Sequence, residues 1–472
     1  MVVKDLNSIK KVFKKIKTPI FGAGVFAFAR LGPEEFIPDY HILSLYFSQE
    51  TKLIERDIPL FCLEKEIGKR LRPRNSSTLL CHPKTKIYLS KFKNPLILTY
   101  RSSKRMEKTA KENGWKIAIS PWRFGKIFLE NKVRFRKVLE KIKVPPTPGR
   151  IISFSSFFSF SFSDFKKEFG IPFVIQHPKK GGGKGTFFIK NDRDFKKVRE
   201  YLKENKARNI IVAKYIKGPS PSITGCVTRF GILSCRPQFQ ICDVKILYNR
   251  DLGSGLFCGH DWSASEFPKK VLNQAKEIVE KVGLFLQKIG YKGIFGLDFV
   301  LDKKTQKLYL TECNPRLLGS FPTLTMIQLF QNEPPLIAFH LLEFLDFSGS
   351  IDKRKIENQL WQKKEGAQMI LHNPRAREAE VKGEVKPGIY RINLRKKEKF
   401  IFVREGYKFS HLQRKDEFLI TDGVPFPGQK LNPYQRICRI LTQDRVLKRR
   451  LNGLLFSVEK KVKVVLKKFK IV

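Results

Sequence analysis

The sequence predicts a mixed α/β and α+β protein, with an N-terminal α/β layer followed by β-rich parts. Three observations point to this class. Apolar runs alternate with helical stretches over residues 18–120, which is typical of a parallel sheet with covering helices. A glycine-rich segment, KKGGGKG, lies between two predicted strands. Two further strands, at 295–301 and 307–314, are joined by the polar turn DKKTQ and form a predicted hairpin.

The composition limits the class of protein. With 472 residues, the chain should hold roughly three domains, each with its own core. No run approaches the roughly 18 apolar residues that a membrane-spanning helix needs, and no apolar block follows the basic N-terminus. The eight cysteines include no CxxC pair, which argues against a zinc knuckle and a disulfide framework. We therefore expect a cytoplasmic protein with reduced thiols.

The chain is strongly basic, with 93 basic and 44 acidic residues and a net charge of +49. Such a charge usually suggests nucleic acid or an anionic membrane as a partner. The lysines are spread over every segment instead of forming one stripe, however, and this spread does not favour nucleic-acid binding. Small anionic substrates and an oligomeric assembly both remain compatible with the composition.

Residues 1–124 are predicted to form an α/β domain. Its strands are expected in TPIFGAGVFAF, YHILSLYF, NPLILTY and WKIAIS, with a helix in SKRMEKTAKENG. The GAG at 22–24 permits a phosphate-binding helix start or a simple tight turn. Because a lone GxG is a weak motif, we favour the turn.

Residues 125–216 are predicted to form a second domain. The stretch 125–143 has apolar residues at helical spacing and is stopped by VPPTPG, because proline cannot continue a helix. The Phe/Ser run at 151–165 allows a strand or a loop. The strands PFVIQ and TFFI flank KKGGGKG, whose glycines let backbone N–H groups gather around an anion. This segment is either a phosphate-covering flap or a plain hairpin loop. A helix near 192–205 and a strand at 209–216 follow.

Residues 217–347 are predicted to form a third domain. A strand at 222–242 leads into a long loop at 248–265, and long loops often cover a functional site. His260 and Asp261 lie in this loop, although a lone loop histidine is more often ordinary than catalytic. An amphipathic helix at 268–289 precedes the hairpin, and a helical stretch at 325–347 follows it.

The hairpin carries the clearest chemical signal. Side chains alternate along a strand, so Glu312 and Asn314 point the same way. With the turn centred near Thr305, Asp298 lies opposite Glu312, roughly 5 Å away between Cβ atoms. The other residues expected on this face are aliphatic: Val300, Leu308 and Leu310. Two facing carboxylates repel each other and are costly to desolvate, which predicts a bound cation such as Mg²⁺. The alternative is a solvent-exposed surface ladder.

Residues 348–472 are predicted to be β-rich, with strands at 366–372, 388–394 and 399–403. They form a separate C-terminal β domain or a closing half-barrel. The basic tail at 440–472 is a helix or a strand, and we expect it to be a solvated closing element.

The order of these segments resembles the ATP-grasp superfamily. The glycine-rich flap between two strands, the strand that links two lobes and a hairpin reading D…E-x-N-P-R carry the resemblance, which covers roughly residues 20–345. It is nearest to the biotin carboxylase, carbamoyl phosphate synthetase and amino-acid ligase types. It implies an ATP-grasp fold, in which 1–124 is the pre-ATP-grasp domain, 125–216 and 217–347 are the two lobes, and 348–472 is the accessory C-terminal β-rich domain.

The resemblance also implies roles for single residues. Asp298, Glu312 and Asn314 would bind Mg²⁺, with Mn²⁺ as an alternative. Arg316 would face the acyl phosphate or the substrate carboxylate, and Lys184 would be the second catalytic cation. The residues implied in ATP binding are Lys132, Gln176, Gly181, Gly182, Gly183, Lys184, Gly185, Val212, Ala213, Lys214 and Tyr215.

Two sites depart from the family pattern. Gln176 stands where the family has its second nucleotide-binding lysine, and it can donate a hydrogen bond but brings no charge. Ala213 and Lys214 occupy the interlobe strand, where acidic residues usually contact the adenine and ribose. The metal end therefore matches the family, whereas the base end is altered.

The resemblance implies an ATP-dependent ligase that activates a small carboxylate as an acyl phosphate and transfers it to an amine or related nucleophile. The altered base end motivates a second hypothesis, an ATP-binding module of the same fold with reduced turnover.

Overall fold

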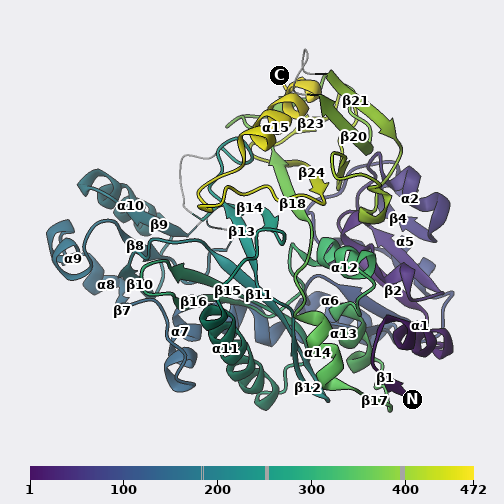
Figure 1. Cartoon of the computed structure of the whole chain (residues 1–472), viewed down its shortest axis with the longest axis horizontal. Coiled ribbons are helices and arrows are strands. Elements are labelled where there is room, and N and C mark those ends of the chain that lie inside the picture. Colours follow the sequence, from purple (N-terminus) through teal and green to yellow (C-terminus); the bar gives the residue numbers. More distant parts are fainter. Residues whose placement is uncertain (182, 184, 250–254, 394–398) are drawn as a thin grey trace.

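The computed structural model describes residues 1–181, 183, 185–249, 255–393 and 399–472 (Figure 1). Three large sheets organise this part of the chain. The five-stranded sheet belongs to the N-terminal domain, the four-stranded sheet projects to one side with α8–α10, and the largest sheet runs from the centre into the C-terminal strands below α15 (Figure 1). No helix in the described ranges is long and apolar enough to cross a membrane.

The N-terminal sheet is parallel, as predicted, with the order β4-β3-β2-β5-β6. Its strands are β2 (Ile20–Gly24), β3 (Tyr40–Ser44), β4 (Leu60–Cys62), β5 (Leu96–Thr99) and β6 (Lys116–Ile117). Its helices are α1 (Leu6–Lys15), α2 (Thr51–Asp57), α3 (Leu63–Ile67), α4 (Ser76–Leu80), α5 (Pro83–Leu89) and α6 (Lys104–Glu112). The three-residue strand β4 was not anticipated, because so short an apolar run has no clear period.

The GAG motif lies inside strand β2, so both the predicted turn and its phosphate-binding alternative are wrong. A Cβ at Gly22 would lie 1.9 Å from the Tyr40 hydroxyl oxygen. That hydroxyl donates to the Arg30 carbonyl at 2.8 Å. The glycine is therefore needed because a tyrosine of the neighbouring strand fills the space of its missing side chain.

The four-stranded antiparallel sheet has the order β7-β10-β8-β9. Its strands are β7 (Gly149–Ser153), β8 (Phe173–Gln176), β9 (Thr186–Ile189) and β10 (Asn209–Lys214), and its helices are α8 (Phe154–Phe157), α9 (Phe162–Phe169) and α10 (Asp192–Glu204). The glycine-rich segment joins the paired strands β8 and β9, as predicted. The Phe/Ser run is mostly helical, neither a strand nor a loop throughout, because Ser153 and Ser161 cap α8 and α9.

The predicted single helix at 125–143 is interrupted. It consists of a π-helical turn (η4, Gly125–Leu129) and α7 (Lys132–Lys141). The Asn131 side chain accepts hydrogen bonds from the backbone N–H groups of Val133 and Arg134, both at 3.1 Å. This N-cap starts a new helix, and it places Lys132 at the first position of α7.

The largest sheet joins the predicted third domain to the C-terminal part. Its first strands are β11 (Pro221–Thr228), β12 (Gly231–Ser234), β13 (Gln238–Cys242), β14 (Phe257–Asp261), β15 (Gly293–Asp302) and β16 (Lys307–Asn314). Its C-terminal strands are β18 (Ala367–His372), β20 (Gly388–Asn393), β21 (Lys399–Arg404), β22 (Phe418–Thr421) and β24 (Arg436–Thr442). Strand β18 pairs with β14, so the C-terminal strands continue this sheet instead of forming a separate β domain.

Two predictions in this region are wrong. The single strand expected at 222–242 is three strands, β11 to β13, because turns at Arg229–Phe230 and around 235–237 reverse the chain. His260 and Asp261 lie on strand β14 and not in a loop. The sequence LFCGHDW has no clear alternation, and its partner β18 lies more than a hundred residues further along the chain.

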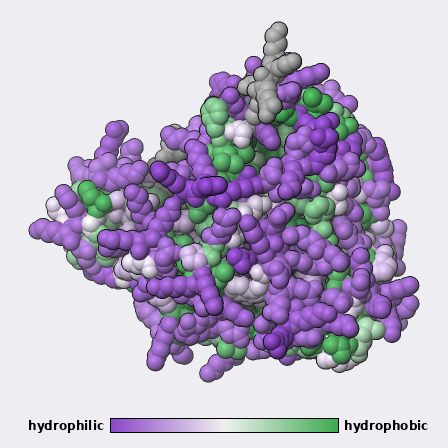
Figure 2. Space-filling view, viewed as in Figure 1, coloured by the Kyte–Doolittle hydropathy of each residue, from purple (hydrophilic) through white to green (hydrophobic). Residues whose placement is uncertain are grey.

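Helices and short ladders complete the fold. The remaining helices are α11 (Lys269–Lys288), α12 (Phe321–Phe330), α13 (Leu336–Phe344), α14 (Lys353–Leu360) and α15 (Phe456–Phe469). Strand β1 (Val2–Val3) pairs with β17 (Ser350–Ile351), and β19 (Ala379–Glu380) pairs with β23 (Lys430–Leu431). All eight cysteines are free, as predicted. Hydrophilic residues cover most of the face shown in Figure 2.

Candidate active site

A cleft of about 500 Å³ lies between the four-stranded sheet and the largest sheet. It brings together residues from predicted sites that are far apart in the sequence. The predicted site residues that line it are Gln176, Gly183, Ala213, Lys214, Tyr215, Asp298, Glu312, Asn314 and Arg316. The predicted metal end and the predicted base end therefore face one cavity.

The hairpin β15–β16 pairs Asp298 with Glu312, as expected, and it also pairs Gly296 with Asn314. A β-bulge after Asp298 leaves Thr311 without a partner, since Phe299 pairs with Leu310. The extra residue places the side chains of β16 between the bulge and the turn, including Leu310 and Leu308, on the opposite face from Glu312. Leu308 and Leu310 accordingly belong to the buried core, so their predicted place beside the two carboxylates is wrong.

Donors and a cation surround the facing carboxylates. Asn314 Nδ2 donates to Asp298 Oδ2 at 2.8 Å, and Gln240 Nε2 donates to Asp298 Oδ1. Lys132 Nζ lies 3.2 Å from Glu312 Oε2. Burial raises the pKa of Asp298, and the negative charge of Glu312 raises it further. Lys132 thus supplies part of the positive charge that the two facing carboxylates require. Its Nζ also donates to the Lys180 carbonyl at 3.0 Å.

The donor set fits Mg²⁺. Two carboxylates and an amide are hard oxygen donors, and Mg²⁺ characteristically takes one or two protein carboxylates and completes its shell with water and phosphate. No group of three or more His, Cys, Asp or Glu side chains suited to a metal occurs in the described ranges. In this geometry Asn314 turns its NH₂ group to Asp298 and its oxygen to Arg316, so its role as third ligand stays a prediction.

Arg316 is held from several sides at the edge of the metal end. Its Nη2 donates to Asn314 Oδ1 at 2.6 Å, and its Nε lies 3.1 Å from Glu130 Oε1. Its Nη1 donates to the Tyr100 hydroxyl, and its guanidinium lies 4.9 Å above the ring of Tyr100. The cation is therefore fixed where it faces the cleft just beyond the two carboxylates.

The predicted nucleotide-binding residues are only partly brought together. Gln176 Nε2 lies 3.4 Å from Thr186 Oγ1 at the cleft wall. Gly183, at φ +76°, lines the cleft, and a Cβ there would lie 2.6 Å from the Gly255 carbonyl oxygen. Val212 is fully buried in the first-lobe core. Gly181 and Gly185 do not line the cleft, and Lys184 and Gly182 lie outside the described residues.

Sequence reasoning missed several residues that line the cleft. Tyr100 comes from the N-terminal domain, Gln240 comes from β13, and Leu447 and Leu451 come from the C-terminal part. His260, which the sequence offered only as a minor candidate, lines the cleft from β14. No local motif marks them, because each reaches the cleft through strand pairing or a long-range chain reversal. The only available signal was the polar pair His260 and Asp261 in an otherwise apolar run.

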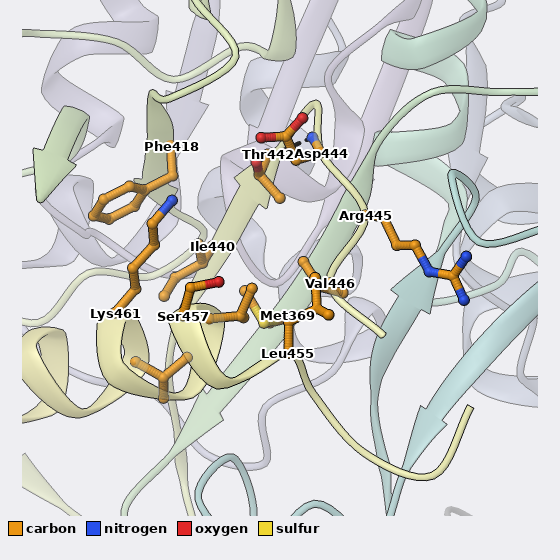
Figure 3. Close-up of a pocket in the computed structure, with 12 residues that line it drawn as sticks. Met369, Phe418, Ile440, Thr442, Asp444, Arg445, Val446, Leu455, Ser457 and Lys461 are labelled. Carbon is orange, nitrogen blue, oxygen red and sulfur yellow. Dashed lines mark hydrogen bonds between the residues drawn. The ribbon is translucent and has the colours of Figure 1, made fainter. Parts of the chain in front are cut away.

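A second cavity of about 280 Å³ lies beneath α15 (Figure 3). Met369, Phe418 and Ile440 give it an apolar floor, with Lys461 on α15 at its edge. Asp261 Oδ2 accepts hydrogen bonds from the backbone N–H groups of Val446 and Leu447, both at 2.8 Å. Val446 lines this cavity and Leu447 lines the cleft. Among the described residues, no pair of facing carboxylates lines this second cavity, so the larger cleft is the candidate active site.

Comparison with known proteins agrees with this geometry. The model of the ATP-grasp domain matches residues 139–320. Over 168 residues the chain is 27% identical to formate-dependent phosphoribosylglycinamide formyltransferase of Methanocella arvoryzae, and the match covers 34% of this chain and 38% of that protein. Over 156 residues it is 27% identical to D-alanine–D-alanine ligase of Petrotoga mobilis, covering 31% and 47%. The chain thus spans less than half the length of these curated relatives.

The likeness in fold extends much further. Biotin carboxylase from Campylobacter jejuni aligns with a TM-score of 0.58 and 15% identity over 99% of this chain and 93% of that one. N5-carboxyaminoimidazole synthase from Aspergillus clavatus aligns with a TM-score of 0.55 and 13% identity over 95% and 99%. Residues 139–320 therefore match the ATP-grasp domain, and the ATP-grasp fold extends over nearly the whole chain.

Proposed function

We propose that this protein is an ATP- and Mg²⁺-dependent ligase, which activates a small carboxylate as an acyl phosphate and transfers the acyl group to an amine or related nucleophile. The observation that carries the proposal is the facing pair Asp298 and Glu312 in one cleft with the fixed cation Arg316. The relatives named above as a D-alanine–D-alanine ligase and a formate-dependent formyltransferase support the same reaction class.

Each residue has a physical task in this proposal. Asp298, Glu312 and Asn314 would hold Mg²⁺, which neutralises phosphate charge when bound. Lys132 already contacts Glu312, and it would stabilise the charge on the transferred phosphoryl group. Arg316 would pair with the substrate carboxylate while one carboxylate oxygen attacks the terminal phosphorus atom of ATP and ADP leaves. The amine would then displace phosphate from the acyl phosphate. The two lobes would exclude water, which would otherwise hydrolyse the acyl phosphate.

The base end supports a second candidate, an ATP-binding module with reduced turnover. Gln176 supplies no charge at the cleft wall, and Ala213 and Lys214 bring no carboxylate to the interlobe strand. Both candidates require nucleotide binding, and they differ in whether ADP release depends on a carboxylate.

The test is ADP release from ATP and Mg²⁺ with formate, D-alanine, bicarbonate and pooled amino acids and dipeptides, each with and without an amine acceptor. The proposal expects carboxylate-dependent ADP release that EDTA abolishes and that Glu312→Gln lowers by at least about a hundredfold. Glu277→Gln is the matched control, because Glu277 is an exposed glutamate of α11 paired with Lys281. Tight Mg-ATP binding without such release would favour the second candidate, and full activity of Glu312→Gln would contradict the site.

A further inference from the structure

The face of the largest sheet that lines the cleft carries a row of polar side chains, which we call the polar row. Glu312 pairs with Asp298, Asp298 with Ser222, Gln240 with His260, and His260 with Gln368. Directly opposite residues of antiparallel strands share a face of the sheet. Gln240 Nε2 donates to Asp298 Oδ1 and so links the two halves of the row. The polar row therefore extends from the predicted metal site to β18.

The hydrogen bonds at the far end of the polar row fix the tautomer of His260. The Arg439 guanidinium can only donate, and its Nη1 contacts Gln368 Oε1, which also accepts from Thr323 Oγ1 at 2.6 Å. The oxygen of Gln368 is thereby assigned, and its Nε2 faces His260 Nδ1 at 2.9 Å. Since Nε2 of Gln368 donates, Nδ1 of His260 must accept. The proton of a neutral imidazole is then on Nε2.

The network is anchored at its far end by Asp422. Arg439 Nε donates to Asp422 Oδ2 at 2.9 Å, and Gln368 Nε2 also reaches the Gly319 carbonyl at 3.4 Å. Within the described ranges, His260 is hydrogen-bonded through Nδ1, and Nε2 makes no side-chain hydrogen bond. His260 is only 4% exposed, yet it lines the cleft. The Nε2–H group is therefore a donor that an oxygen of a ligand in the cleft would accept.

His260 also stays neutral. Burial lowers its pKa to about 3, and the positive charge of Arg439 contributes to the shift. The ring lies against Phe257 at 4.8 Å and Trp262 at 5.4 Å between centroids, so its orientation is fixed by packing. It is therefore a rigid, uncharged donor at neutral pH, unlike the cation Arg316 further along the cleft.

We propose that His260 binds the carboxylate substrate, donating a hydrogen bond from Nε2–H to one of its oxygens while Arg316 pairs with its charge. The segment 316–319 connects the two groups, since Arg316, Leu318 and Gly319 line the cleft. The Gly319 carbonyl accepts hydrogen bonds from Gln368 and Arg439. This inference rests on the proposed ligase function. In this proposal His260 favours substrates that present an oxygen acceptor to Nε2–H. The polar row holds His260 in the position from which it donates.

The first experiment determines the tautomer by ¹⁵N NMR of the histidine side chains, with His260→Gln used to assign the signal. We expect Nε2–H and an unprotonated Nδ1 in the wild type. Gln368→Glu should move the proton to Nδ1, because a glutamate carboxylate accepts and cannot donate. Formate, D-alanine or bicarbonate, added with Mg-ADP, should shift the Nε2–H resonance. A wild-type Nδ1–H tautomer, or no shift with any of the three probes, would overturn the proposal.

The second experiment compares His260→Phe with His260→Gln. Phenylalanine fills the ring volume and lacks the donor, whereas glutamine keeps an amide donor. We expect His260→Phe to raise KM for the carboxylate about ten- to hundredfold, to leave the Kd for Mg-ADP within about twofold, and to be rescued in large part by glutamine. Equal losses in both variants, or a parallel loss of Mg-ADP affinity, would indicate a purely structural role.

The two proposals fail separately. If the chain shows no carboxylate-dependent ADP release but the Nε2–H signal shifts with a carboxylate, the ligase function is wrong and the hydrogen bond stands. If ADP release is normal in His260→Phe, the ligase function stands and the inference about His260 is wrong.

Discussion

The contact between Lys132 and Glu312 gives a quantitative test of the site in the absence of nucleotide. Lys132 Nζ lies 3.2 Å from Glu312 Oε2, and the side chains are 5% and 23% exposed. At an effective dielectric constant of about 20, two unit charges at this distance attract by about 5 kcal/mol. Desolvation of the buried ammonium group offsets much of this attraction. We expect a coupling energy of about 2 kcal/mol, which is about thirtyfold in the unfolding equilibrium.

The measurement is a double-mutant cycle with Lys132→Met, Glu312→Gln and the double variant, followed by urea unfolding without Mg²⁺. The losses of unfolding free energy in the two single variants should add up to more than the loss in the double variant. The reason is that each single variant leaves the other group without its partner. The exposed pair Lys281 and Glu277, at 2.7 Å on α11, is the matched control and should couple by about 0.3–0.5 kcal/mol.

Additive effects at Lys132 and Glu312, within the range of the control pair, would refute the reasoning. They would mean that Lys132 does not neutralise the carboxylate pair in the folded protein. A coupling well above that of the control would instead support a site in which Lys132 holds the place of a stronger cation until metal and nucleotide bind.

Three further predictions follow from single contacts. Glu417 is hydrogen-bonded to Arg404, and this interaction lowers the pKa of Glu417 to about 2. The resulting stability of about 3 kcal/mol is present above the ordinary glutamate pKa and is lost as pH falls towards 2. The unfolding curves of Glu417→Gln and the wild type should therefore converge in acid. Gly259→Ala should cost more than about 2 kcal/mol of unfolding free energy, because Gly259 has φ +144° and its Cβ would lie 2.0 Å from the Gln368 carbonyl oxygen; an unchanged Tm would contradict this. Gln176→Lys should raise Mg-ADP affinity about three- to tenfold by calorimetry, whereas a tenfold loss would mean that Gln176 has another task.

The predictions that succeeded rest on local patterns. The turn DKKTQ closes a hairpin between two strands that are consecutive in the sequence, so the hairpin itself follows from nearby residues alone. The bulge at Thr311 could not be foreseen, because it depends on how the strand fits the core on its other face. Near the turn the register differs by one residue from the prediction, because Asp302 pairs with Lys307. The bulge then shifts the register by one residue, and this shift restores the expected pairing of Asp298 with Glu312.

The site residues divide in the same way. Asp298, Glu312 and Arg316 lie within one motif, and a resemblance in sequence was enough to propose their roles. Gln240 and His260 have no motif, and they enter the site because β13 and β14 bring them beside Asp298 and Gln368. The chemical role of a polar residue in a strand cannot be assigned until its neighbours on the adjacent strands are known.

The sequence by itself determined the parallel N-terminal layer, the glycine-rich connection between strands and the two facing carboxylates. These features depend on period, turn chemistry and residues close together in the chain. Only the tertiary structure decided that the C-terminal strands continue the sheet through β14 and β18, and that Arg439 and Gln368 orient His260 towards the cleft. Pairing between distant strands is selected by the burial of whole sheet faces, a property that no local stretch of sequence encodes.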